Sequence, residues 1–110
     1  MQGLAHESLE SLYESLANYS TKNAIETTEA IYNRIENLKS FPYIGRYIPE
    51  IPNKRFRELI YRKTQHSVYR IIYYISEINQ TIYVIYIFNS KQDFQGLLKL
   101  HNYFNNSFQF

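Results

Sequence analysis

The sequence of 110 residues contains no cysteine. The chain therefore forms no disulfide, offers no thiol nucleophile and builds neither a cysteine-rich zinc site nor an iron–sulfur centre. A chain without cysteine suits a reducing compartment, and we expect the protein to be cytoplasmic. Its histidines and carboxylates also lack metal-ligand spacing, so we expect no metal and no cofactor.

Long apolar runs are absent as well. The longest extends from Ile82 to Phe88, which is too short to cross a bilayer. The N-terminus lacks the basic and then apolar pattern of a secretion signal, so we expect no membrane segment and no signal peptide. A chain of this length buries enough surface for one modest core, which predicts a single domain over residues 1–110.

Glycine and proline are scarce, with three of each, whereas the chain has 12 tyrosines and 14 isoleucines. This aromatic and β-branched bias is typical of a sheet backed by helices. The net charge is only +2, but residues 41–70 carry seven basic residues against Glu50 and Glu58. Such a local positive field attracts phosphates or acidic proteins.

Two helices are predicted at the start of the chain. Apolar residues at spacings of three and four place one stripe on a helix that begins near residue 4. Ser20 or Thr21 caps a second helix, and Pro42 ends it because the residue before a proline is pushed out of the helical conformation. The two helices form an antiparallel hairpin over residues 4–40.

Residues 43–54 are predicted to be an irregular connection, since they contain one glycine and two prolines. We expect Gly45 to adopt a positive φ in the turn after Pro42. We expect Arg46 to tie the connection to Glu50 or to a backbone carbonyl.

After this connection the apolar period changes to two. Three strands joined by short polar turns predict an antiparallel meander over residues 55–89. The helical hairpin should cover one apolar face of the middle strand, while Arg70 stands on the opposite face. The predicted strands are Arg55–Lys63, Ser67–Ser76 and Thr81–Phe88.

A short C-terminal helix over residues 93–105 and a frayed tail over residues 106–110 complete the predicted chain. The predicted fold class is therefore α+β. An N-terminal antiparallel helical hairpin packs on one face of a three-stranded antiparallel sheet, and a short helix follows the sheet.

Four short motifs follow the predicted helices in a fixed order. They are Phe41-Pro42-x-x-Gly45-Arg46-x-x-Pro49-Glu50, Arg57-Glu58-Leu59, Tyr69-Arg70-Ile71-Ile72-Tyr73 and Asn89-Ser90-Lys91-Gln92-Asp93-Phe94. Together, over residues 4–98, they resemble the RelE/ParE toxins of bacterial type II toxin–antitoxin systems. The resemblance implies a cognate antitoxin as partner and a hetero-oligomer with it.

The first departure from the family pattern concerns the sheet. Family members usually open with a β-strand before the first helix, and residues 1–4 leave almost no room for one. Either the chain begins late, or the sheet has one strand fewer and an exposed edge that invites pairing with a partner.

The second departure concerns chemistry. In RelE-like members that cleave mRNA, a strand arginine, a second arginine and a C-terminal aromatic residue or histidine gather around the phosphate. Arg70 matches the first, but Gln92 stands at the second position and Leu98 near the aromatic. ParE-like members inhibit DNA gyrase without cutting RNA and often carry a His-x-x-Arg/Met-Asp pattern. Residues 89–93 have its spacing and its Asp93 but not its histidine, which favours a ParE-like binding toxin.

If the protein is an enzyme, the resemblance implies a metal-independent endoribonuclease. Such cleavage needs a base, an acid and cations around the developing charge. Arg70 would stabilise that charge with help from Arg57 and Lys91, and His101 or Glu58 would move protons. Arg57 and Arg70 lie on neighbouring strands and are expected to converge in an open basic hollow.

The alternative is that these arginines form a solvated charged face or pair with acidic residues, namely Glu50, Glu58 or Asp93. Glu58 suits this role because it points to the strand face opposite Arg57. Arg70 is otherwise expected to be exposed, so that its replacement by alanine leaves folding largely intact.

The sequence is compatible with three functions. The first is a toxin that inhibits growth by binding an essential target such as DNA gyrase and is neutralised by its antitoxin. The second is a ribosome-dependent mRNA endonuclease. The third is a disabled toxin that only binds antitoxin. In a binding toxin, the contact surface is expected to comprise Lys54, Arg55, Arg57, Arg62, Arg70, Lys91 and Gln92.

Overall fold

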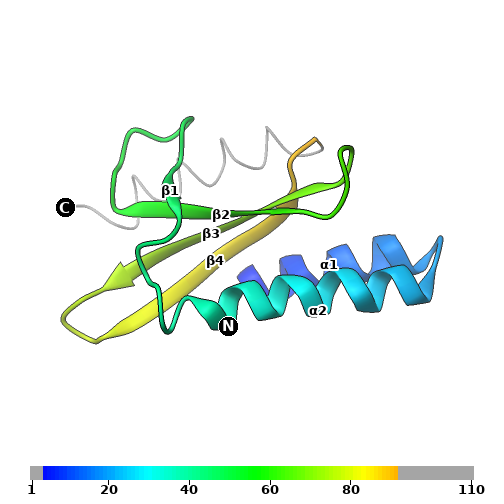
Figure 1. Ribbon diagram of the computed structural model, residues 1–110, viewed down its shortest axis with the longest axis horizontal. Helices are drawn as coiled ribbons and strands as arrows, with labels where there is room; N and C mark the ends of the chain where they lie inside the picture. Colours follow the sequence, from blue (N-terminus) through cyan, green and yellow to red (C-terminus); the bar gives the residue numbers. More distant parts are fainter. Residues whose placement is uncertain (1–3, 92–110) are drawn as a thin grey trace.

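The computed structural model describes residues 4–91, in which two helices lie side by side on one face of an antiparallel sheet (Figure 1). The predicted α+β class is confirmed. The elements follow one another as α1 (Leu4–Ala17), α2 (Thr21–Asn37), β1 (Arg46–Tyr47), β2 (Phe56–Arg62), β3 (Val68–Ser76) and β4 (Thr81–Asn89).

The helical hairpin begins and turns where the sequence predicts. Ser20 is the N-cap of α2, and its hydroxyl oxygen accepts a hydrogen bond of 3.1 Å from the backbone N–H of Asn23. This bond satisfies one of the N–H groups that the first helical turn leaves without an intrahelical partner. One face of α2 is buried, and its buried residues are Ala24, Thr27 and Ile31.

The sheet has four strands in the order β1-β2-β3-β4, and each neighbouring pair is antiparallel. The predicted meander of β2, β3 and β4 is confirmed, and no end differs from its predicted position by more than one residue. The additional strand β1 pairs Arg46 with Glu58 and Tyr47 with Arg57. Two residues contain too little alternation to be recognised from sequence, which is why the prediction lacked this strand.

The sheet buries side chains on both faces. The helices cover the face that carries Tyr69, Ile71 and Ile87, and Ile31 of α2 belongs to the same buried cluster. This is the arrangement that the alternation in β3 predicts.

The opposite face is covered as well, which the sequence did not indicate. There Ile48 and Ile51 of the connection before β2 pack against Phe56, Ile72 and Phe88. The connection therefore lies across the sheet as a second layer, and the face of Arg70 is not an open hollow.

Several predictions fall outside the described residues. The missing first strand concerns residues 1–3, and the C-terminal helix and tail concern residues 93–110. Within residues 4–91, neither helix combines the length and apolar character that crossing a bilayer requires.

We predict that Ile71→Ala lowers the free energy of unfolding by roughly 2 to 5 kcal/mol, because it opens a cavity between sheet and helices. Ile71 is fully buried, whereas Ile78 is 97% exposed at the β3–β4 turn. Ile78→Ala is therefore the matched control, and it should change the stability by less than about 0.5 kcal/mol. Urea titrations of both variants measure the difference. Equal losses would show that Ile71 does not belong to the core.

Candidate functional site

The polar centre of the sheet is Glu58, a carboxylate that is only 1% exposed. Its two oxygens bind different arginines: Oε1 accepts from Nε of Arg70 at 2.6 Å, and Oε2 accepts from Nε of Arg46 at 2.7 Å. A buried charge is stable only when it is paired and hydrogen-bonded. Glu58 is therefore the salt-bridge partner that the sequence predicted.

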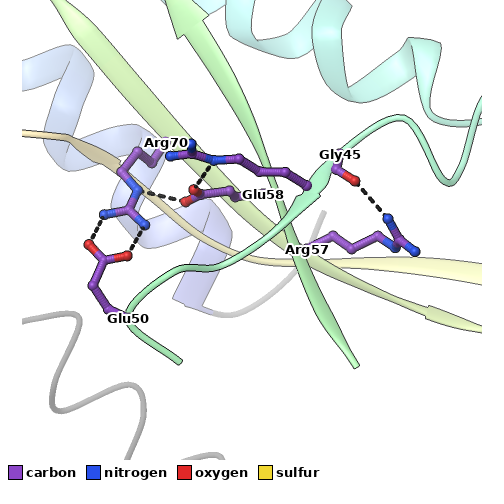
Figure 2. Close-up of polar contacts among 6 residues, drawn as sticks. Gly45, Glu50, Arg57, Glu58 and Arg70 are labelled. Atoms are coloured by element: carbon purple, nitrogen blue, oxygen red, sulfur yellow. Dashed lines mark hydrogen bonds and ion pairs between the residues drawn. The ribbon is translucent and has the colours of Figure 1, made fainter. Parts of the chain in front are cut away.

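Arg70 is held by a second carboxylate from the connection (Figure 2). Its Nη1 and Nη2 donate to the two oxygens of Glu50 at 2.7 Å each, which is the strong forked geometry of arginine with a carboxylate. The Arg70 guanidinium also lies 5.4 Å from the centre of the Phe88 ring. Arg70 is 8% exposed, so the expectation of an exposed strand arginine is wrong.

The pairing shifts the protonation equilibria of both partners. Burial by itself lowers the pKa of Arg70, but the hydrogen bonds that Arg70 donates to Glu50 and Glu58 outweigh this effect, and the pKa lies above the ordinary arginine value. The hydrogen bonds from Arg70 hold the pKa of the Glu50 carboxyl below its usual range, against a smaller opposing effect of burial. Both groups are therefore charged at neutral pH.

The strand register explains why these charges meet. Glu58 pairs with Ile72 and Arg70 with Ile60, so Glu58 and Arg70 are diagonal neighbours on the same face of β2 and β3. Glu50 reaches the same place because Ile48 and Ile51 anchor the connection in the core beneath it. Arg46 binds Glu58, not Glu50 or a carbonyl as the sequence suggested.

Arg57 does not converge with Arg70. It pairs with Tyr73 in the register and so lies on the helix-facing side of the sheet, which overturns the predicted shared hollow. Its Nη1 donates to the carbonyl oxygen of Gly45 at 2.7 Å (Figure 2). Its guanidinium stacks on Tyr47 at 4.5 Å and on Tyr43 at 5.3 Å from the ring centres. The sequence analysis does not include either tyrosine among the site residues. The pattern that could have indicated them is their position two residues before and two residues after Gly45.

Gly45 is required for close packing, not for a positive φ as expected. Its N–H donates to the hydroxyl of Tyr73 at 2.9 Å, and that hydroxyl donates to the carbonyl of Pro42 at 2.9 Å. A Cβ at position 45 would lie 2.5 Å from this hydroxyl oxygen, whereas the φ of Gly45 is not in the left-handed range. Burial raises the pKa of Tyr73, which therefore keeps its proton and its donor role.

The other basic residues of the predicted binding set separate into two groups. Lys54 and Arg55 are exposed just before β2 begins, and Arg62 is exposed where β2 ends. Lys91 lies at the same end of the sheet as Arg62 and forms the second group with it. Val68 pairs with Arg62, and its carbonyl accepts a hydrogen bond of 2.8 Å from the N–H of Ser90, the residue before Lys91. Gln92 and His101 lie outside the described residues.

An open groove of about 630 Å³ surrounds the first group. We name it the Arg57 groove, and the residues that define it are Tyr43, Tyr47, Lys54, Arg57, Tyr74 and Ile78. Its walls combine cations with aromatic rings, which suits recognition of an anionic partner better than acid–base chemistry. Within residues 4–91 there is no cluster of three or more histidines and carboxylates that would hold a metal ion.

A family model described as the ParE toxin of the type II toxin–antitoxin system parDE matches residues 2–94. No curated protein and no solved structure matches the chain.

We predict that Arg70→Ala destabilises the protein by roughly 3 to 5 kcal/mol, because it leaves the buried Glu58 charge without one of its two arginines. Arg62→Ala removes the same charge at an exposed strand end and should cost less than about 0.5 kcal/mol. Chemical unfolding of both variants tests this contrast. A small effect of Arg70→Ala would contradict the buried network.

The lowered pKa of Glu50 predicts a pH-dependent contribution to stability. The carboxyl takes up a proton more readily in the unfolded chain, so its contribution is present above the ordinary glutamate pKa of about 4.3 and is lost as pH falls through the lower folded-state pKa. Glu50→Gln should therefore be less stable than the wild type near pH 6, and the gap should shrink below about pH 4.

Thermal unfolding between neutral and acidic pH measures this gap. Glu29→Gln removes one exposed carboxylate from α2 and serves as the control. A gap for Glu50→Gln that stays constant down to acidic pH would show that the ion pair contributes nothing through ionisation.

Proposed function

Because this chain belongs to the ParE toxin family of type II toxin–antitoxin systems, we propose that it inhibits growth by binding an essential target, DNA gyrase. Membership of the family implies an antitoxin as partner. In this proposal the cognate antitoxin forms a hetero-oligomer with the toxin in the cytoplasm and neutralises it.

One observation carries the choice of binding over RNA cleavage: Arg70 is occupied by two carboxylates of its own chain. Stabilising the charge that develops during phosphodiester cleavage requires a cation whose N–H groups face the phosphate. Three N–H groups of Arg70 are engaged by Glu50 and Glu58, and little of its surface is accessible. An RNA phosphate would first have to displace the forked bond to Glu50.

The other candidate catalytic residues in the described part of the chain do not assemble around a common point either. Arg57 lies on the other face of the sheet, and Lys91 follows β4 at the end opposite Lys54 and Arg55. Glu58 is buried between arginines, where it is inaccessible to a substrate hydroxyl. Catalytic roles for these residues and for His101 therefore stay predictions of the alternative, an mRNA endonuclease.

We assign target and antitoxin contact to cations on the surface. Lys54, Arg55, Arg62 and Lys91 are exposed, and Arg57 is half-buried with an open groove beside it. Arg70 also belongs to the predicted binding set, but it is buried. Gln92 lies outside the described residues.

We predict that purified protein inhibits supercoiling by DNA gyrase and that its induced expression stops growth without cutting transcripts. Gel analysis of plasmid topology measures the first effect, and primer extension on cellular mRNA measures the second. Topoisomerase I relaxation of the same plasmid should be unaffected and controls for simple DNA binding.

Codon-positioned breaks in mRNA would instead establish the endonuclease. Normal growth with folded protein, together with unaffected gyrase, would leave a disabled toxin that only binds antitoxin.

A further inference from the structure

The Arg57 groove lies where β2 begins and β3 continues past it. The last pair between these strands joins Phe56 to Tyr74, whereas β3 extends to Ser76. The groove follows this overhang and reaches Ile78 at the turn. The connection forms the opposite wall, since the hydroxyl of Tyr43 donates a hydrogen bond to the Glu77 carboxylate.

Two cations of the groove, Arg57 and Lys54, contact neutral groups. Among residues 4–91, the Arg57 guanidinium donates to neutral oxygens, namely the carbonyls of Tyr43 and Gly45 and the hydroxyl of Tyr47. Lys54 lies 5.7 Å from the centre of the same Tyr47 ring. Within residues 4–91 neither Arg57 nor Lys54 contacts a carboxylate, in contrast to Arg70, which contacts two.

The charge balance of the groove is therefore positive. Its lining residues include three basic side chains and one carboxylate, Glu77. Glu77 is itself engaged by Tyr43, whose pKa is raised by that hydrogen bond. Lys54 and Arg57 lie beside one aromatic ring and have no carboxylate partner in the described part of the chain, so they form a site that an incoming anionic group would neutralise.

The groove also presents apolar surface. Ile78 is 97% exposed at its end, and the rings of Tyr74 and Tyr83 stack at 4.9 Å between centres beside it, with Tyr83 40% exposed. A partner that fills the groove therefore gains from burying aliphatic side chains as well as from placing carboxylates near Lys54 and Arg57.

The distribution of charge favours a peptide over a nucleic acid. Single-stranded nucleic acids follow a continuous positive track along their phosphates. Here the exposed cations at the two ends of β2 are separated by roughly 20 Å, the length of a seven-residue strand. Between them, on the other face, the charges are already paired through Glu50 and Glu58. The groove is thus a local anionic and aliphatic site.

We propose that the Arg57 groove binds an acidic segment with aliphatic side chains from a partner protein. Its carboxylates lie against Lys54 and Arg57, and its aliphatic side chains lie against Ile78 and the tyrosine rings. The identification of this partner as the antitoxin rests on the function proposed above. The chemical class of the segment follows from the groove itself and does not depend on that function.

The test uses the full-length protein and a short fluorescein-labelled peptide of alternating glutamate and leucine. An extended peptide of this kind places carboxylates and apolar side chains on opposite faces. Fluorescence anisotropy should show binding that Lys54→Glu weakens at least about tenfold. The matched control is Lys22→Glu, which makes the same change of charge at an exposed position in the first turn of α2 and should leave binding within about twofold. Both residues are exposed, so both variants should fold.

Equal weakening by the two variants, or no binding of the peptide, would overturn the proposal. An oligouridine of the same length provides the second arm, and its tighter, Lys54-dependent binding would identify the groove as a nucleic-acid site instead. Because this assay contains no gyrase, its failure is separate from failure of the proposed function. A protein that inhibits gyrase but does not bind the peptide would refute the groove proposal and leave the proposed function intact.

Discussion

The fold depends on one buried carboxylate. Glu58 sits in the middle of the sheet with its side chain fully buried, and a lone charge in that position would cost several kcal/mol. Arg70 from β3 supplies one partner and Arg46 from β1 the other. The connection must therefore return to the edge of the sheet to form β1, and in doing so it brings Ile48 and Ile51 over the second face. Electrostatic pairing and apolar burial thus select the same path for the chain.

This arrangement assigns different roles to two arginines that look alike in the sequence. Arg70 is a structural residue because both of its carboxylate partners lie within the chain. Within residues 4–91, Arg57 contacts carbonyl and phenol groups and aromatic rings, and none of these neutralises its positive charge. A surface that recognises other proteins needs charges of the second kind. The contrast between the two arginines supports the proposed binding function.

The sequence predicted the elements well because they depend on local signals. The Ser20 cap, the helical stripes and the alternation in β3 all act within one element, and the structure confirms them. The site depends on relations between elements, which alternation alone does not determine. The covering of the second face by Ile48 and Ile51 follows from an irregular segment without periodicity. The role of Gly45 depends on Tyr73, which is 28 residues away, and so could not be recognised from its neighbours.

The separation of Arg57 from Arg70 is a matter of register, and the register is fixed by the same carboxylate. Sliding β2 by one residue against β3 would turn Arg57 to the face of Arg70 and assemble the predicted basic hollow. The same slip would turn Glu58 away from Arg70 and toward the helices, into the apolar cluster of Ile31, Tyr69 and Ile71. An unpaired carboxylate there would destabilise the fold by several kcal/mol, a large share of the stability of a domain of this size. The two arginines therefore remain on opposite faces, and the buried position of Glu58 keeps them from sharing one basic hollow.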